Sequence, residues 1–231
     1  MRLKAFSVVS DVDHPGAERL RRSAAYWGWD HTFIKQEKGW RPTYGAEQEG
    51  QLQALSRFSP EFFIYVDGWD TVFTGPPQEL PLERGKLFFG GDTVCYPEGS
   101  KLEDAFPSVG LEEFRYVNCG TIWGDSMIMS ELAAEYLTHS PEVVNQAYFN
   151  YRYMFERGLG RKRLLLDIRA EVALNIMLVQ LRYFKFAHNR IHYTPTSTMP
   201  LVLHSAGVGP SLSEQGKMAP MPKEIEELYA K

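Results

Sequence analysis

The stretch FFIYVDGWDTVFTG, residues 62–75, decides the fold that this sequence predicts. Its first five residues form an unbroken apolar run, which is too short for a helix and lacks the alternation of a half-exposed strand. Such a run is typical of a strand that is covered on both faces in a parallel sheet. The run ends abruptly at Asp67, and the following loop carries a second carboxylate, Asp70. The pattern therefore predicts a buried strand with two acidic residues at its carboxyl end.

Strand and helix patterns alternate on both sides of this stretch. Apolar runs predict further strands at 4–10, 31–35, 87–89, 116–123, 164–168 and 201–204. Apolar residues at helical spacing predict helices at 17–27, 46–58, 126–137 and 144–155, the first of them ending at Gly28. We therefore expect one α/β domain over residues 1–231, with a mostly parallel, Rossmann-like sheet flanked by helices. In such sheets, ligands lie beyond the carboxyl ends of the strands.

Composition and charge limit the class of protein. The 231 residues are 44% apolar, and 25 basic against 29 acidic residues give a net charge of −4, which argues against a disordered chain or a protein devoted to gripping duplex DNA. No apolar run approaches the ~18 residues of a bilayer span, and the N-terminal apolar stretch is shorter than a secretory signal. Cys95 and Cys119 form no disulfide framework or zinc cluster. We expect a cytoplasmic protein with no membrane partner.

One region of the chain is strongly basic. Residues 152–192 contain nine Lys or Arg and three acidic residues, a local excess of six positive charges. A solvated helix face would explain this excess, and contact with an anionic partner would explain it equally. For an anionic acceptor such as modified DNA, we expect the contacts to come from Arg161, Lys162 and Arg163.

Three residues are candidate metal ligands. The carboxylates of Asp67 and Asp70 suit Mg²⁺ or Mn²⁺, which commonly take one or two protein carboxylates together with substrate phosphates. A turn in which Asp67 caps a helix is the alternative. His204 ends another apolar run, and a neutral imidazole can join two carboxylates on Mn²⁺. A hydrogen-bonded histidine at a strand end is the alternative there. Gly207 and Gly209 follow it, and small residues let backbone N–H groups approach a diphosphate.

Trp69 lies between the two aspartates. If those carboxylates hold a metal-bound nucleotide, the indole could stack on the base, because aromatic faces accept nucleobases. Packing in the core is the alternative role for this side chain.

Six blocks of the sequence share their order with those of a known family. They are RLRRSAAYWGW (19–29), FIYVDGWDTVFTGPPQEL (63–80), FFGGDTVCYPE (88–98), YVNCGTIWGD (116–125), NQAYFNYRY (145–153) and PLVLHSAGVGP (200–210). In this order they resemble the glycosyltransferase domain of the multifunctional procollagen lysyl hydroxylases. The resemblance implies a GT-A-like fold and a metal-dependent hexosyltransferase with a nucleotide-sugar donor. The residues that match the family's donor site are Asp67, Asp70 and His204 for the metal, Trp69 for the base, and Asn118, Gly120, Gly207 and Gly209 for the donor sugar and diphosphate.

The resemblance also suggests catalytic residues. Asp92 takes the place of a glutamate that faces the acceptor. Where the family has aspartates before a glutamine, this chain has Asn145 before Gln146, so an amide stands beside the transferred sugar and cannot act as a general base. Asp92 and Asp167 are then the candidate bases. Asp167 could equally be a polar residue at the end of a strand.

The sequence thus predicts an enzyme that moves a hexose from a nucleotide sugar, with UDP as the expected nucleotide, to a hydroxyl acceptor, using Mn²⁺ or Mg²⁺. The acceptor stays open between a hydroxylated base in DNA, a hydroxylated protein side chain and a glycan. Two other classes use the same residues. One is a metal-dependent nucleotide hydrolase or nucleotidyltransferase, and the other is a catalytically silent nucleotide-sugar or glycan-binding module, which the amide at Asn145 favours.

Overall fold

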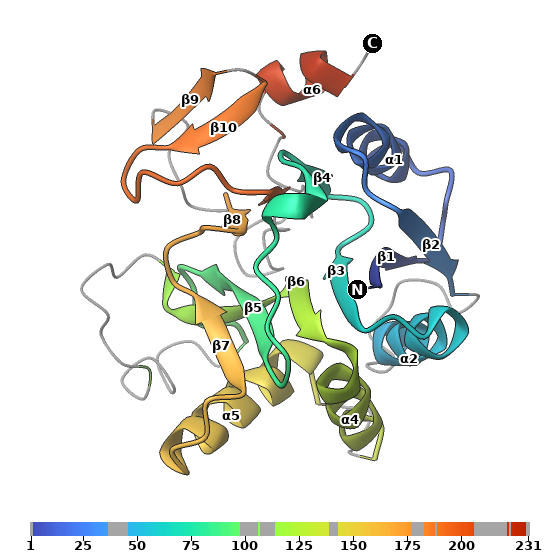
Figure 1. Cartoon of the computed structure of the whole chain (residues 1–231), viewed down its shortest axis with the longest axis vertical. Helices are drawn as coiled ribbons and strands as arrows, with labels where there is room; N and C mark the ends of the chain where they lie inside the picture. The colour runs from blue at the N-terminus through green and yellow to red at the C-terminus, as the bar shows by residue number, and fades with distance from the viewer. Residues whose placement is uncertain are drawn as a thin grey trace.

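A six-stranded sheet with the order β2-β1-β3-β6-β5-β7 forms the centre of the protein (Figure 1). The computed structural model describes residues 2–36, 46–97, 106, 114–138, 143–176, 183–187, 189–205, 221 and 223–229. The strands are β1 (Leu3–Val9), β2 (His31–Lys35), β3 (Phe62–Val66), β5 (Leu87–Asp92), β6 (Tyr116–Asp125) and β7 (Leu164–Asp167). Neighbouring strands are parallel except that β6 runs antiparallel to both β3 and β5. The predicted mostly parallel sheet is confirmed.

Helices cover both faces of this sheet. On one face, α2 (Ala46–Phe58), α4 (Ser126–Tyr136) and α5 (Asn145–Gly158) pack in one apolar cluster with the sheet. On the other face lie α1 (Pro15–Trp27) and a smaller sheet with the order β4-β11-β8. Gly28 ends α1 in the left-handed conformation, with φ of 78°, as predicted.

The smaller elements were harder to predict from the sequence. The second sheet consists of β4 (Thr71–Phe73), β8 (Ala173–Asn175) and β11 (Val202–His204), of which only β11 was predicted. A hairpin of β9 (Phe184–Ala187) and β10 (Arg190–Tyr193), the short helix η1 (Pro77–Glu79) and α6 (Lys223–Tyr229) complete the described elements. Strands of three or four residues are too short for a periodic pattern, so their pairing depends on the neighbours that the fold supplies.

The side chains of β3 explain its unbroken apolar run. Phe63 and Tyr65 enter the cluster beneath α2, α4 and α5, whereas Ile64 and Val66 enter the cluster beneath α1. All four side chains are buried, because successive residues of a strand point to opposite faces and both faces are covered.

Within the described part of the chain, no helix combines the length and apolar character that a bilayer span requires.

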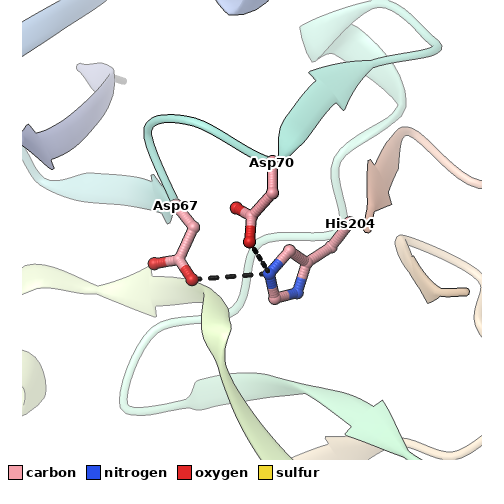
Figure 2. A group of neighbouring side chains, drawn as sticks. All are labelled: Asp67, Asp70 and His204. Carbon is pink, nitrogen blue, oxygen red and sulfur yellow. Dashed lines mark ion pairs between the residues drawn. The ribbon is translucent and has the colours of Figure 1, made fainter. Parts of the chain in front are cut away.

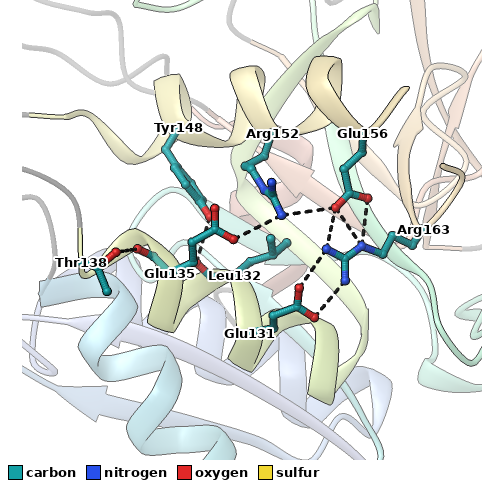
Figure 3. A network of polar contacts seen from close by, with 8 residues as sticks. All are labelled: Glu131, Leu132, Glu135, Thr138, Tyr148, Arg152, Glu156 and Arg163. Atoms are coloured by element: carbon teal, nitrogen blue, oxygen red, sulfur yellow. Dashed lines mark hydrogen bonds and ion pairs between the residues drawn. The ribbon is translucent and has the colours of Figure 1, made fainter. Parts of the chain in front are cut away.

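Part of the basic stretch belongs to a network of ion pairs (Figure 3). The Arg163 guanidinium donates to both oxygens of Glu131 at 2.9 Å, and its Nε donates to Glu156 at 2.8 Å. Arg152 lies 3.2 Å from Glu135 and 3.5 Å from Glu156, whose side chain is 1% exposed. The network joins α4, α5 and the start of β7. Arg163 therefore has a structural role, whereas Arg161 has an exposed side chain.

Replacing Arg163 should destabilise the protein. The change Arg163→Met leaves the buried Glu156 carboxylate with one distant partner, and we expect the free energy of unfolding to fall by about 3 kcal/mol, as for other broken buried pairs. Denaturant unfolding measures this loss. The control Arg161→Gln removes an exposed charge and should change stability little. Equal stabilities of the two variants would show that the network contributes nothing.

Candidate metal centre

Asp67, Asp70 and His204 meet at the carboxyl end of β3 (Figure 2). Asp67 directly follows β3, Asp70 directly precedes β4, and His204 ends β11. Because β4 and β11 are antiparallel, with His204 opposite Thr71, the histidine comes to lie beside the aspartates. Its Nε2 is 3.4 Å from Asp67 Oδ2 and 3.5 Å from Asp70 Oδ2. One potential ligand atom from each residue lies within 4.8 Å of the others.

Main-chain hydrogen bonds hold the loop that carries the aspartates. The Asp67 N–H donates to the Gly120 carbonyl at 2.8 Å, and the Ser205 N–H donates to the Asp70 carbonyl at 2.7 Å. The Tyr65 hydroxyl donates to Asp67 Oδ1 at 2.9 Å. These bonds link the loop to β6, to the residue after β11 and to β3, so the two carboxylates have defined positions before any ligand binds.

Asn175 orients the imidazole of His204. Its amide nitrogen donates to the Gly91 carbonyl, so its Oδ1 faces His204 Nδ1 at 2.6 Å. An amide oxygen only accepts, and His204 Nδ1 therefore carries a proton. Nε2 is buried and makes no hydrogen bond within the described residues, although it faces two carboxylates. A histidine whose second nitrogen donates to an outer partner is typical of metal ligation.

The charges of the three residues are strongly coupled. Burial alone would lower the pKa of His204, but the nearby carboxylates of Asp70 and Asp67 raise it to about 10. Burial would raise the pKa of Asp67, yet His204 brings it below the ordinary value. At neutral pH the histidine is thus protonated, and a divalent cation would displace that proton. Two carboxylates and one imidazole fit Mn²⁺, while Mg²⁺ prefers oxygen ligands throughout.

Asn118, Gly120 and Asp92 lie in a hydrogen-bond chain that reaches the metal centre. A Cβ at Gly120 would be 2.1 Å from Cε1 of His204, so only glycine permits the imidazole to lie there. The Asn118 Oδ1 accepts from the Gly120 N–H at 2.8 Å, and its Nδ2 donates to Asp92 Oδ2 at 2.9 Å. Burial raises the pKa of Asp92, although hydrogen bonds from Asn118 and the main chain oppose the rise.

Asp167 has the geometry of a strand-end residue. Its carboxylate accepts main-chain N–H groups from Glu171 at 2.9 Å, Val172 at 2.8 Å and Ala173 at 2.9 Å. These bonds hold the turn that leads from β7 into β8. Asp167 thereby holds the strand that carries Asn175. Of the two roles considered for Asp167, general base and strand-end residue, these hydrogen bonds favour the second.

Asn145 and Gln146 begin α5, beside a carboxylate that was not predicted from the sequence. The Asn145 amide donates to Glu47 Oε2 at 2.6 Å, and its Oδ1 accepts from the Gln146 N–H at 2.6 Å. Burial, followed by the charge of Asp67, raises the pKa of Glu47 to about 8. Glu47 precedes Asn145 by 98 residues and carries no motif, so only the packing of α2 and α5 reveals the pair.

Trp69 lies outside the apolar clusters of the described residues. Its half-buried indole stacks on His14, with ring centroids 4.6 Å apart and an interplanar angle of 27°, and its Nε1 donates to the Asp11 carbonyl at 3.1 Å. Gly207 and Gly209, predicted to approach the diphosphate, fall outside the described residues.

A mostly parallel sheet of this kind, with two aspartates after a central strand and a histidine beside them, is the architecture of a GT-A-like glycosyltransferase. The family model of the PLOD GT domain matches residues 2–215, and the chain belongs to this family. Among solved structures, the "crystal structure of a glycosyltransferase involved in the glycosylation of the major capsid of PBCV-1" is similar, with a TM-score of 0.54 and 13% identity over 94% of this chain and 100% of that one. No curated protein sequence matched. The predicted family, fold class and glycosyltransferase activity are confirmed.

Removing the Asn175 amide should weaken cation binding. In Asn175→Ala the imidazole loses its Nδ1 partner, and outer partners of metal-bound histidines typically contribute 10- to 100-fold in affinity. Calorimetric titration with Mn²⁺ measures the loss, and thermal unfolding verifies the fold. Asn175→Asp retains an acceptor for Nδ1 and should bind more tightly than the alanine variant. A folded Asn175→Ala variant with unchanged Mn²⁺ affinity would contradict the assigned role.

Proposed function

We propose that this glycosyltransferase holds Mn²⁺, or Mg²⁺, through Asp67, Asp70 and His204 and transfers a hexose from a UDP-sugar to a hydroxyl acceptor. The observation that carries the proposal is the buried His204 Nε2, which faces two carboxylates and makes no hydrogen bond among the described residues. When bound, the cation supplies positive charge that offsets the charge developing on the leaving diphosphate. Tyr65 and Asn175 keep the ligands in place.

The remaining donor contacts are those that the resemblance to the family implies. Trp69 stacks on the base, with His14 covering one face of the indole. Asn118 and Gly120 border the donor sugar, and Gly207 and Gly209 approach the diphosphate.

The chemical step depends mainly on positioning. Holding the acceptor hydroxyl against the anomeric carbon replaces a bimolecular encounter by an oriented one. Of the two candidate bases, Asp92 lies in the hydrogen-bond chain of the metal centre, whereas the main-chain bonds to Asp167 hold the turn between β7 and β8. The acceptor is a hydroxylated DNA base, a hydroxylated protein side chain or a glycan. The pairing of Arg163 with two glutamates removes one of the three cations expected to contact DNA.

One screen separates the proposed function from its alternatives. The protein is incubated with Mn²⁺, a panel of nucleotide sugars and hydroxylated acceptors, and both free nucleotide and acceptor mass are followed. A transferase releases nucleotide as the acceptor gains a hexose. A nucleotide hydrolase or nucleotidyltransferase would instead turn over the nucleotide equally well with every acceptor omitted. A silent binding module would bind the donor and release nothing.

Nucleotide binding should require the metal ligands. We expect UDP to bind more tightly in Mn²⁺ than in EDTA, because two carboxylates and one imidazole leave coordination positions for phosphate oxygens. Asp67→Ala should abolish the difference, whereas Glu224→Gln, an exposed change on α6, should preserve it. Calorimetric titration of UDP provides the measurement. Equal UDP affinity with and without Mn²⁺ in the unaltered protein would refute the metal assignment.

Trp69→Ala should weaken UDP binding by roughly 1–3 kcal/mol, the range for one base stacked on an aromatic side chain. The thermal transition should persist, because the indole is half-buried and lies outside the apolar clusters of the described residues. Titration and thermal unfolding of the same sample test both statements. Loss of the cooperative transition would instead assign Trp69 to the core.

A further inference from the structure

Glu47 supplies a carboxylate that the proposed metal centre does not use. It lies in the first turn of α2, beside the start of α5. Its Oε2 accepts from Asn145 Nδ2 at 2.6 Å, and its Oε1 accepts from Gln51 Nε2 at 3.0 Å. The Tyr65 hydroxyl lies close enough to lower the pKa of this carboxyl group.

Glu47 borders the metal centre through Tyr65. The Tyr65 hydroxyl donates its proton to Asp67 Oδ1 at 2.9 Å and also acts on the pKa of Glu47, so this hydroxyl group lies between the two carboxyl groups. Their proximity is also visible in the electrostatics, since the charge of Asp67 contributes to the raised pKa of Glu47. A group bound to the Asp67 cation would therefore extend within reach of this glutamate.

The hydrogen bonds of Glu47 leave room for one more donor. A carboxylate offers about four lone-pair positions, and Gln51 and Asn145 donate to two of them. The residue is half-buried. Asn145 is less suited to bind a further group, because both ends of its amide already have partners. Its Nδ2 donates to Glu47 and its Oδ1 accepts from Gln146.

Packing alone does not require an acidic group at this position. A glutamine at position 47 would have the same shape and could still accept from Asn145. A carboxylate so close to Asp67 costs free energy through desolvation and like-charge repulsion. A ligand that donates a hydrogen bond to the carboxylate would compensate for part of this cost, because charge-assisted bonds are stronger than neutral ones.

We propose that Glu47 binds a hydroxyl group of the sugar that is attached to the nucleotide diphosphate, and that Asn145 is the positioning residue that holds the Glu47 carboxylate. This inference rests on the proposed function, which brings a diphosphate and its sugar to the metal centre beside Asp67. A sugar hydroxyl donates the bond, and the Glu47 carboxylate accepts it. The resemblance to the family leads us to expect an acid at position 145. The chain has an amide there, and this amide holds the carboxylate of Glu47, which comes from α2.

The test compares UDP with intact UDP-sugars, here UDP-glucose and UDP-galactose, in the presence of Mn²⁺. The quantity compared between variants is the dissociation constant of UDP divided by that of the tighter-binding UDP-sugar. This ratio measures how much the sugar adds to the affinity for UDP. In Glu47→Gln this ratio should fall about tenfold, the lower end for a hydrogen bond to a charged group, while UDP affinity stays unchanged. Glu49→Gln is the matched control, an exposed glutamate in the same helical turn, and should leave the ratio unaltered.

A second variant tests the role of Asn145. Asn145→Ala leaves the Glu47 carboxylate without one of its partners, so the ratio should fall by less than in Glu47→Gln, again at constant UDP affinity. Thermal unfolding of each variant verifies the fold.

Three results would overturn the inference. An unchanged ratio in Glu47→Gln would show that the carboxylate does not touch the sugar. An equal loss of UDP and UDP-sugar affinity would place its effect on the metal centre instead. If the unaltered protein binds no UDP in Mn²⁺, the proposed function itself fails, and the inference fails with it, which distinguishes that case from the first two.

Discussion

The hydrogen bond between Asn175 and His204, 2.6 Å long, is the constraint on which the arrangement of the site depends. It assigns the proton to Nδ1 and turns Nε2 toward Asp67 and Asp70. The bond exists because β8 and β11 are parallel neighbours with Asn175 opposite His204. It also requires Gly120 on β6, since any side chain there would collide with the imidazole. Three strands that are distant in sequence, β6, β8 and β11, thus together orient His204 Nε2 toward the two aspartates.

The site concentrates negative charge in a buried setting. Glu47, Asp67 and Asp92 all act on the thiol of Cys119, and after burial their charges contribute to raising its pKa far above the usual value. A diphosphate would be repelled by such a field, whereas a divalent cation is attracted to it. A nucleotide donor is therefore expected to enter this site together with its cation. The same reasoning explains why a charged Glu47 near Asp67 would be costly without a ligand.

The ion pairs of α4 and α5 support the site from a distance. Arg152 and Arg163 tie α5 to α4 and to the start of β7 through Glu135, Glu156 and Glu131. The helix that these ion pairs anchor begins at Asn145. The bond from Asn145 to Glu47 depends in turn on that starting point. Two of the nine basic residues in 152–192, Arg152 and Arg163, thus serve the architecture, because their guanidinium groups neutralise the buried Glu156.

The amino-acid sequence by itself determined the central sheet, the long helices and the three residues that meet at the candidate metal centre. Strong local signals carry these features: the apolar run 62–66 must be covered on both faces, and Asp67, Asp70 and His204 stand at the ends of such runs. Only the tertiary structure decided the reversed direction of β6, the short strands β4 and β8, and the partnerships of Asn175 and Glu47. A strand of three residues has no period, and the direction of a strand leaves no trace in its composition. The two polar partners bond across 29 and 98 residues of sequence, so their roles arise from strand register and helix packing, which no local pattern encodes.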